Sequence, residues 1–226
     1  MIRALVFDVF GTLVDWRSGV ARALAAAGVP GDPAQLADDW RNRYRPAMDE
    51  ANRGERDAPT FDALHLQTLD ELLAERGVEG VDPAARAELV EAWHRLDPWP
   101  DVREGLEALR RDHVTATLSN GHVALLVDLA RHGDMRFDAI LSAQMTGAYK
   151  PAPETYRMAA TFLDVEPGEL MLVAAHPWDL AGARAAGLRR AFVERPLEYG
   201  PGSPARSDPE ADVSACDLLD LASRIA

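Results

Sequence analysis

Three short polar segments carry the side chains with the clearest capacity for chemistry. Asp8 precedes a Gly11-Thr12 turn, Ser119-Asn120 offers small polar donors, and Lys150 stands just before a predicted helix. A carboxylate that is held dry and oriented can act as a nucleophile. A nearby ammonium group keeps that carboxylate ionised and balances the charge of an anionic substrate. Alone, each segment is more typical of a cap, a turn or a solvated lysine, so the prediction of a reactive site depends on their order and spacing together.

The elements expected around these segments bring them to one edge of a sheet. Apolar runs predict buried strands at 4–8, 114–118, 139–142 and 170–174, with a candidate fifth strand at 191–193. Helical patterns fill the gaps at about 101–111, 121–132, 153–163, 178–186 and 216–225. This alternation predicts an α/β fold with a parallel sheet covered on both faces. Sites of such sheets lie beyond the carboxyl ends of the strands, where Asp8, Ser119 and His176 are expected.

Residues 16–98 interrupt the alternation. They contain only helical patterns, at about 17–27, 33–51, 60–76 and 83–96. Because these helices fall between the first and second strands, they are predicted to form an inserted all-helical cap. Asp97-Pro98-Trp99-Pro100 marks the expected return to the core, since a residue before proline is pushed out of helix. The later stretch 198–212 contains several Gly and Pro residues and is predicted to be a surface loop.

Composition and charge narrow the function classes. The 226 residues are 47% hydrophobic and 27% charged, the balance of a globular protein with a sizeable core. The 37 acidic side chains outnumber the 24 basic ones, and the net charge of −13 disfavours nucleic acids and anionic membrane surfaces as partners. An anionic substrate would need a locally positive pocket. The single cysteine, Cys216, and the lack of a signal-like or membrane-spanning apolar run predict a cytoplasmic protein without intrachain disulfides.

Together, the three polar segments resemble the motifs of the haloacid dehalogenase superfamily over roughly residues 4–220. In that family the Asp of the first strand is the nucleophile, the Ser or Thr of the second strand binds the substrate anion, and a Lys before a helix steadies the nucleophile. The resemblance assigns these roles to Asp8, Ser119 and Lys150. It implies a Rossmann-like catalytic core of residues 1–15 and 99–226 with a helical cap of residues 16–98.

The motifs differ from those of the magnesium-dependent phosphatases that make up most of this superfamily. Those enzymes carry a second Asp two residues after the nucleophile, where this chain has Phe10. They also carry a metal-binding Asp after the fourth strand, where this chain has Ala175. Of the acidic residues of that motif, this chain retains only the later Asp179. Mg²⁺ needs several oxygen ligands in a near-octahedral shell, and phosphoryl transfer depends on cations. The sequence therefore predicts no metal and no other cofactor.

The (S)-2-haloacid dehalogenase branch of the superfamily, often called type II, resembles the sequence more closely. This branch has an aromatic residue at the Phe10 position, uses no metal, and takes an arginine from the first long cap helix. The resemblance makes that arginine Arg41, which would hold the substrate and the departing halide. Further positions that the branch uses are occupied here by Thr12, Asn120, Tyr156, Trp178 and Asp179. Without the resemblance, Arg41 would be interpreted as a solvated side chain of the cap.

His176 is the most informative departure from this branch, whose better-known members have Asn at that position. We expect His176 to donate to halide or carboxylate, or to help activate the hydrolytic water; the alternative is a structural histidine bonded to a backbone carbonyl. Donors from Arg41, Asn120 and His176 also raise the hypothesis of fluoroacetate turnover. The remaining histidines show no metal-ligand spacing and are interpreted as structural or surface residues: His65, His94, His113, His122 and His132.

The resemblance implies hydrolytic dehalogenation of short 2-haloalkanoic acids, such as haloacetate and (S)-2-halopropionate, to 2-hydroxy acids. Asp8 attacks C2 from the face opposite the halide and forms an ester. Water, assisted by Asp179 and His176, then attacks the side-chain carbonyl carbon of Asp8. The alternatives are a superfamily phosphatase with a degraded metal site and a non-catalytic member that binds a small acid or a protein. Relatives are often homodimers, so a homodimer is the assembly that the resemblance implies.

Overall fold

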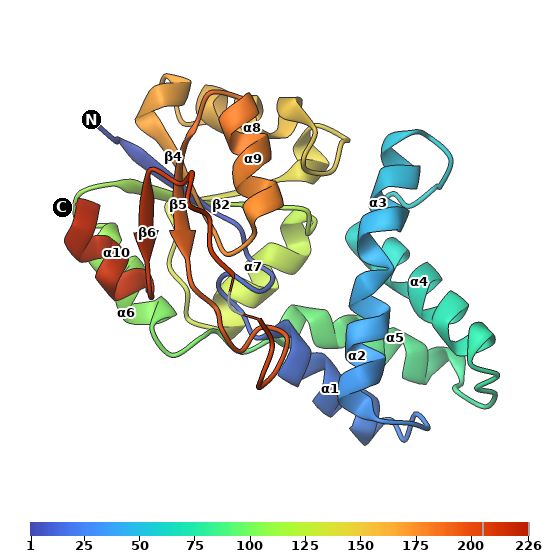
Figure 1. Ribbon diagram of the computed structural model, residues 1–226. Helices are drawn as coiled ribbons and strands as arrows, with labels where there is room; N and C mark the ends of the chain where they lie inside the picture. Colours follow the sequence, from blue (N-terminus) through green and yellow to red (C-terminus); the bar gives the residue numbers. More distant parts are fainter. Residues whose placement is uncertain (205, 226) are drawn as a thin grey trace.

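A six-stranded parallel sheet forms the centre of the computed structural model, which describes residues 1–204 and 206–225 (Figure 1). The strands lie in the order β3-β2-β1-β4-β5-β6. Their bounds are β1 (Ala4–Phe7), β2 (Val114–Ser119), β3 (Ala139–Ser142), β4 (Leu170–Ala174), β5 (Arg189–Val193) and β6 (Val213–Ala215). The predicted α/β fold with a parallel sheet is confirmed. The short edge strand β6 was not predicted, because three residues carry no readable periodicity.

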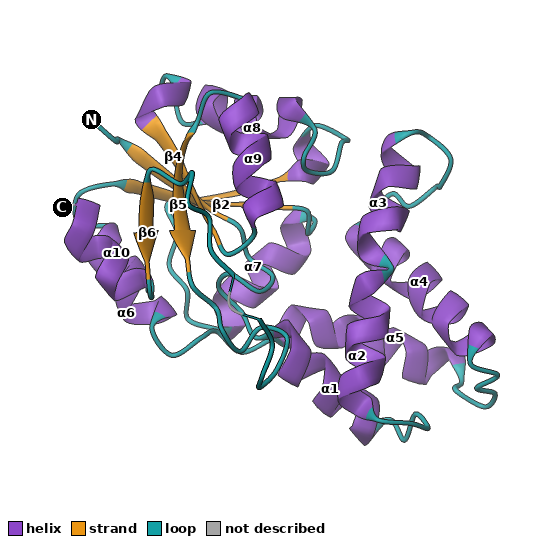
Figure 2. Cartoon of the chain, in the orientation of Figure 1, coloured by secondary structure: helices purple, strands orange, loops and turns teal. Residues whose placement is uncertain are grey.

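Helices cover both faces of the sheet, as Figure 2 shows, and the central strand β1 is therefore apolar throughout rather than alternating. Ala4 and Val6 of β1 belong to the buried cluster on the side of α8 (Pro153–Phe162) and α9 (Pro177–Ala185). Leu5 and Phe7 belong to the other cluster, with the apolar faces of three helices. These helices are α6 (Val102–Leu109), α7 (Val123–His132) and α10 (Leu218–Ile225).

The central position of β1 brings three chain segments together. β1 pairs in parallel with β2 and with β4, and Phe7 lies opposite both Thr117 and Val173. The residues that follow these pairs therefore leave the sheet at the same edge. Asp8, Ser119 and His176 are among them, as the sequence predicts.

The helices that follow β1 form a separate lobe beside the sheet (Figure 1). They are α1 (Trp16–Ala26), α2 (Pro33–Asn42), α3 (Tyr44–Asn52), α4 (Phe61–Glu75) and α5 (Pro83–Glu91), followed by a 3₁₀ turn at Ala92–Arg95. Side-chain caps set most of the helix starts: the side chains of Asp15, Asp32, Thr60 and Asp82 each accept a hydrogen bond from a first-turn N–H.

The predicted helix 33–51 is in fact two helices. α2 ends at Asn42 and α3 begins at Tyr44. Pro46 explains the break, because it has no N–H to donate to the carbonyl of Asn42 and its ring would clash with that carbonyl in a continuous helix. Pro46 is tolerated in the first turn of α3. The predicted helix 83–96 also ends early, at Glu91, where the 3₁₀ turn takes over.

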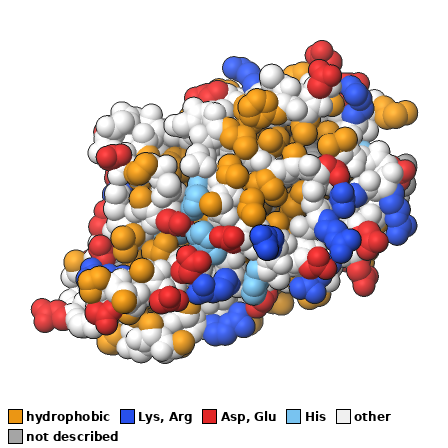
Figure 3. Space-filling model, turned by 180° about the vertical axis from the view of Figure 1, so that it is seen from behind, with side chains coloured by type: hydrophobic (Ala, Val, Ile, Leu, Met, Phe, Trp, Pro, Cys, Tyr) orange, Lys and Arg blue, Asp and Glu red, His pale blue; other side chains and the backbone are white. Residues whose placement is uncertain are grey.

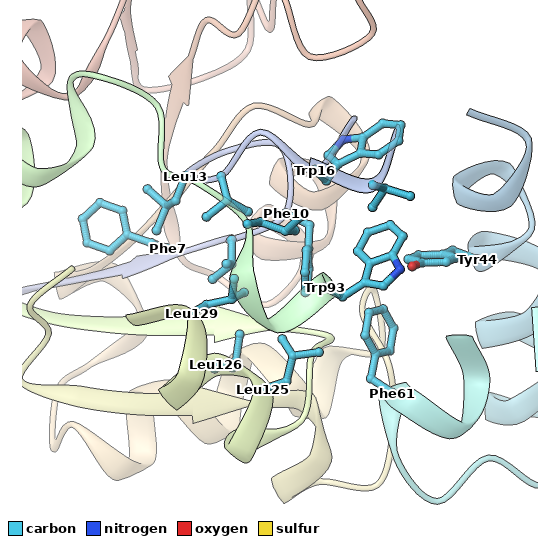
Figure 4. Close-up of a cluster of buried hydrophobic side chains, with 14 of the residues drawn as sticks. Phe7, Phe10, Leu13, Trp16, Tyr44, Phe61, Trp93, Leu125, Leu126 and Leu129 are labelled. Carbon is cyan, nitrogen blue, oxygen red and sulfur yellow. The ribbon is translucent and has the colours of Figure 1, made fainter. Parts of the chain in front are cut away.

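Aromatic side chains join the helical lobe to the core (Figure 4). The ring of Trp93 lies 5.9 Å from that of Phe10, 6.4 Å from that of Trp16 and 5.1 Å from that of Tyr44, between centroids. Phe10 follows β1, whereas Trp16, Tyr44 and Trp93 come from the inserted helices and the turn that ends them. This shared cluster holds the lobe against the carboxyl edge of the sheet.

The surface carries charges of both signs. On the face shown in Figure 3, the Lys and Arg side chains are scattered among acidic ones and form no continuous basic area. No helix in the described part of the chain combines the length and apolarity needed to cross a bilayer.

Candidate active site

Asp8 lies directly after the central strand β1 and is nearly buried. Its Oδ2 atom accepts hydrogen bonds from Thr12 Oγ1 at 2.8 Å and from His176 Nδ1 at 2.9 Å. Its Oδ1 atom has a single longer contact, with Lys150 Nζ at 3.4 Å. Burial alone would raise the pKa of Asp8, but Lys150 and His176 outweigh burial and hold that pKa well below its ordinary value. Asp8 is therefore an ionised, oriented carboxylate with one oxygen left comparatively free.

Lys150 is completely buried and is shared by two carboxylates. Its ammonium group donates to Asp179 Oδ2 at 2.7 Å as well as to Asp8. Burial would lower the pKa of Lys150, but Asp179 and Asp8 raise it above its ordinary value. Asp179 also accepts a hydrogen bond from the Tyr156 hydroxyl at 2.6 Å, and burial raises the pKa of Asp179 despite the attraction of Lys150. The result is a buried network in which Lys150 offsets the charge of Asp8.

His176 lies between two carboxylates. Its Nδ1 atom contacts Asp8, and its Nε2 atom contacts Glu198 Oε1 at 2.9 Å. Burial would lower the pKa of His176, but Glu198 and Asp8 together raise it to about 9. Trp16 Nε1 also donates to Glu198 Oε1 at 3.2 Å, and Glu198 is only 1% exposed. The expectation that 198–212 forms a surface loop is therefore wrong at its first residue, because this carboxylate is drawn in by His176 and Trp16.

A cavity of about 280 Å³ opens above Asp8. Its wall combines residues from the strand ends with residues from the inserted helices and the loop after β5. The lining residues are Asp8, Phe10, Arg41, Asn42, Tyr44, Arg45, Met48, Phe61, Ser119, Asn120, His176, Trp178, Tyr199 and Arg206. Apart from Asp8, the charged groups among them are cationic. The locally positive pocket that an anionic ligand requires is thus present in a chain of net charge −13.

Arg41 projects into this cavity from α2 without a carboxylate partner among the described residues. The carbon at the centre of its guanidinium lies 4.9 Å from the centroid of the Tyr44 ring, 5.4 Å from Trp16 and 5.9 Å from Phe10. Aromatic faces attract a cation and exclude water. Arg41 is therefore a half-buried cation that is available to an anion.

Ser119 and Asn120 form the wall contributed by the end of β2. Ser119 Oγ accepts a hydrogen bond from the Gly121 N–H at 3.3 Å, which orients the hydroxyl and leaves its proton to donate elsewhere. The Asn120 side chain is fixed by its carbonyl oxygen, which accepts from the Lys150 backbone N–H at 2.8 Å. Its amide nitrogen contacts only the Met48 sulfur, at 3.1 Å, among the described atoms. Because a thioether is a weak acceptor, this amide can be redirected to an anion.

The residues predicted from the sequence fall into two groups. Those that line the cavity are Asp8, Phe10, Arg41, Ser119, Asn120, His176 and Trp178. Those that lie behind this wall are Thr12, Lys150, Tyr156 and Asp179. Thr12, for example, donates to Asp8 and accepts from the Ala175 N–H at 3.0 Å, so its hydroxyl is fully engaged in holding the carboxylate.

Six charged or aromatic residues of the site were not predicted. Glu198, Tyr199 and Arg206 come from the loop after β5, Tyr44 and Arg45 from the first turn of α3, and Phe61 from the start of α4. Arg45 lies over the Trp178 ring, 4.7 Å from its centroid. The Gly- and Pro-rich composition of the loop gave no sign that Glu198, Tyr199 and Arg206 belong to the site. The break at Arg43 turns Arg45 toward Trp178, and the sequence indicates this break only through Pro46.

The surroundings of Asp8 do not suit a magnesium ion. The Phe10 ring packs against Phe61 and Trp93 at 5.7 and 5.9 Å between centroids, where a phosphatase would need a carboxylate. Ala175 offers no side-chain ligand. The charged groups nearest to Asp8 are Lys150 and a protonated His176, whose positive charges would repel a dication. No reaction step is therefore assigned to a metal.

Similarity to known proteins covers nearly the whole chain. A family model described as a haloacid dehalogenase-like hydrolase matches residues 2–187. (S)-2-haloacid dehalogenase 1 of Pseudomonas sp. (strain CBS-3) is 34% identical over 205 residues, which cover 88% of each protein.

Solved structures agree in fold over the same length. A defluorinating L-2-haloacid dehalogenase has a TM-score of 0.93 and 41% sequence identity, covering 99% of this chain and 94% of that chain. The L-2-haloacid dehalogenase of Xanthobacter autotrophicus, solved with chloropropionic acid covalently bound, has a TM-score of 0.85 and 27% identity, covering 99% of this chain and 98% of that chain. With its parallel sheet, its buried Asp8–Lys150 pair and these matches, the chain belongs to the haloacid dehalogenase-like hydrolase family.

Proposed function

We propose that the protein hydrolyses short 2-haloalkanoic acids, such as haloacetates and (S)-2-halopropionates, to 2-hydroxy acids without a metal. The observation that carries this proposal is an ionised Asp8 on the floor of a cavity whose wall holds the unpaired cation Arg41. A carbon–halogen bond next to a carboxylate fits such a pair, because the nucleophile and the acceptor of the departing anion face the same space. The names of the relatives point to the same class of substrate.

Substrate binding would use the donors at the end of β2 and the cations of the cap. The substrate carboxylate is held by Ser119 and adjacent backbone N–H groups. Arg41 and the Asn120 amide receive the halide, and both lack a strong competing acceptor among the described residues. Phe10 and Trp178 supply apolar walls that keep water away from the reacting carbon.

The first chemical step is attack by Asp8 Oδ1 on C2. This oxygen is chosen because its one contact is long, whereas Oδ2 already accepts two short hydrogen bonds. The new C–O bond forms as the carbon–halogen bond breaks, and the halide leaves with the bonding electrons toward Arg41. Attack from the opposite face inverts the carbon centre and leaves an ester on Asp8.

The second step is attack of water on the side-chain carbonyl carbon of that ester. Oδ2 then carries the developing negative charge, and its two donors, Thr12 and His176, are already in place at 2.8 and 2.9 Å. In the free site, where Asp8 and Glu198 are both ionised, a pKa of about 9 makes His176 an imidazolium at neutral pH. Glu198 still lies beside Nε2 once the ester has formed, so His176 acts as a donor rather than as a base. Asp179, whose pKa is raised by burial, accepts one proton of the water. The ester C–O bond then breaks, and the 2-hydroxy acid leaves with that proton on its oxygen. The second water proton is released as the acid that accompanies the halide, and Asp8 is again a carboxylate.

Several residues would act by positioning others. Thr12 holds Asp8, Tyr156 holds Asp179, and Lys150 keeps both carboxylates ionised while it is itself withdrawn from the cavity. Residues 16–98 would act as a cap over a core formed by 1–15 and 99–226. The proposal also includes a homodimer, which sedimentation tests, and a cytoplasmic location, in keeping with the exposed thiol of Cys216.

The test is halide release from each enantiomer of 2-chloropropionate in the presence of EDTA, with Asp8→Asn as the matched variant. We expect release from the (S) form alone and none from Asp8→Asn. A single turnover in ¹⁸O-water should label the Asp8 side chain, because water attacks the ester carbonyl and the product takes its oxygen from Asp8. Label in the product alone would overturn the ester mechanism, and magnesium-dependent phosphate release would favour a phosphatase.

Fluoride is included in the proposal for a specific reason. A fluoride leaving group needs strong donors, and this site offers the half-buried Arg41 and an Asn120 amide whose one partner among the described residues is a sulfur. One relative is described as defluorinating. Fluoride release from fluoroacetate, compared with chloride release from chloroacetate at equal enzyme concentration, tests this extension.

A further inference from the structure

A second group of polar side chains meets at the boundary between cap and core, outside the active site. Asp62 lies in the first turn of α4, His94 in the 3₁₀ turn after α5, and His122 immediately before α7. Nε2 of His94 lies 3.1 Å from one Asp62 oxygen, and Nε2 of His122 lies 3.5 Å from the other. The three ligand atoms all lie within 4.8 Å of one another.

These separations are close to those between ligands of a four-coordinate metal ion. Bonds of about 2.0–2.2 Å to zinc place neighbouring tetrahedral ligand atoms roughly 3.3–3.5 Å apart. Two imidazole nitrogens and a carboxylate oxygen are donors that suit zinc and its neighbours in the transition series. The three residues are separated by about thirty positions each, so no sequence motif could have signalled the group.

The environment of His94 strengthens this interpretation. Its other nitrogen, Nδ1, donates to Asp128 Oδ2 at 2.8 Å. Metal-bound histidines commonly make this second contact with a carboxylate, because it fixes the ring and directs the lone pair of Nε2 toward the ion. His122 lacks such a second contact, because its Nδ1 has no partner among the described residues, but its Nε2 faces Asp62.

We propose that Asp62, His94 and His122 bind a divalent transition-metal ion, with zinc as the best fit, and that Asp128 positions His94 for it. The fourth ligand is a water molecule. Access comes from a cavity of about 230 Å³ that is lined by His122 together with Phe61 and Asn120. The chemistry proposed for Asp8 does not use this ion.

The position of the site gives the ion a structural consequence. Asp62 follows Phe61, which lines the active-site cavity, and His122 lies two residues after Asn120. An ion bound to both would clamp α4 of the cap against the loop that carries Ser119 and Asn120. Binding of the ion should therefore raise the melting temperature of the whole protein.

Glu91 allows a neighbouring ion position to be tested separately. Glu91, His94 and Asp128 also lie close enough to share a ligand set, on the Nδ1 side of His94. That set has one histidine and two exposed carboxylates, whereas the proposed set has two buried histidines. Glu91→Gln should leave the proposed site intact.

The experiment uses the complete chain after removal of metals with a chelator. Equilibrium dialysis against Zn²⁺ with elemental analysis should find one ion per chain, and Co²⁺ should give the visible absorption of a tetrahedral site. His122→Gln and Asp62→Asn should each abolish stoichiometric binding and the associated rise in melting temperature. Asp128→Asn should weaken binding by about 10- to 100-fold.

Two variants serve as matched controls. His132→Gln removes a different, exposed His–Asp pair, in which His132 Nε2 lies 3.2 Å from Asp97, and it should bind zinc like the wild type. Glu91→Gln should do the same. Should His122→Gln prove unfolded, Asp62→Asn decides, because this carboxylate is partly exposed and its replacement keeps the side-chain shape.

Three results would overturn the proposal. The first is the absence of a stoichiometric ion in the wild type. The second is binding that survives both His122→Gln and Asp62→Asn. The third is binding that is lost in His176→Gln but kept in His122→Gln, because that ion would belong to the active site.

Discussion

Two histidines in this protein each lie between two carboxylates, but we assign them different functions. His176 lies between Asp8 and Glu198, and His94 lies between Asp62 and Asp128. The pKa of each is raised to about 9, because in each case the carboxylates outweigh the effect of burial. The arrangement of one histidine between two carboxylates therefore does not by itself determine the function of the group.

The surroundings of the two trios differ in burial and in what lies beside them. The side chains of Asp8 and Glu198 are 10% and 1% exposed, whereas those of Asp62 and Asp128 are 32% and 53% exposed. In the buried group around His176, the charges act on the reacting Asp8 with little screening. In the partly exposed group around His94, water screens the charges. His94 instead has His122 beside it, and these two histidines form the proposed set of metal ligands together with Asp62. The predictions below test that division of roles.

His176→Gln should give the largest effect. It removes a charged donor to Asp8 Oδ2, and loss of one such donor costs about 10²- to 10³-fold in kcat. Because Arg41 and Lys150 remain, the first step should persist, and the ester should accumulate as one halide per enzyme followed by slow turnover. Intact-protein mass spectrometry measures this adduct. An unchanged kcat, or a loss without adduct, would contradict the role assigned to His176.

Glu198→Gln should change the pH dependence more than the maximal rate. His176 is an imidazolium below its pKa of about 9, so kcat should fall as the pH rises through that value. The charged groups around His176 are Asp8 and Glu198, with Arg41 and Arg206 beyond them. Removing the charge of Glu198 leaves Asp8 alone to hold the proton.

We expect the alkaline limb of kcat in Glu198→Gln to move down by about one pH unit. A hydrogen bond to a charged group is worth roughly 1–1.5 kcal/mol more than a neutral one, and one pKa unit corresponds to about 1.4 kcal/mol. A pH profile of kcat from 6 to 10 for both proteins measures the shift. A limb that stays in place would mean that another group titrates there.

His94→Gln should have the smallest effect and should show it in stability. In EDTA the variant loses hydrogen bonds to two partly exposed carboxylates, and we expect the free energy of unfolding to fall by about 1–2 kcal/mol. Urea titration at pH 7 measures this change. An equally large fall in the free energy of unfolding in Asp128→Asn alone would contradict the view that water screens the His94–Asp128 pair. Such an exposed pair is worth about 0–1 kcal/mol.

The parts of the site that the sequence predicts are those fixed by local elements. Asp8, Ser119 and His176 follow apolar runs, so a parallel sheet brings them to one edge whatever the loops do. Lys150 and Arg41 were assigned by resemblance, and the structure places Lys150 against Asp8 and Arg41 in the cavity above it. The central arrangement of β2, β1 and β4 accounts for the meeting of Asp8, Ser119 and His176 at one edge of the sheet.

What the sequence could not predict depends on contacts between distant residues. Glu198 stands in a stretch rich in Gly and Pro, and nothing local shows that Trp16 and His176 will bury it. Glu198 also lies so close to Gly11 that a Cβ atom on residue 11 would be 2.2 Å from Glu198 Oε1, and only the structure shows this contact. His94 and His122 likewise look like isolated side chains until the helices pack.

The path of the chain through the active site also sets the order in which the site is made. Trp16 and Glu198 are 182 residues apart in sequence, yet they meet beside Asp8. At roughly 5–20 residues per second, the ribosome adds Glu198 about 10 to 40 s after Asp8. During that interval the nascent chain holds the nucleophile without the carboxylate that keeps its neighbour His176 charged, so the complete site forms only as translation nears its end.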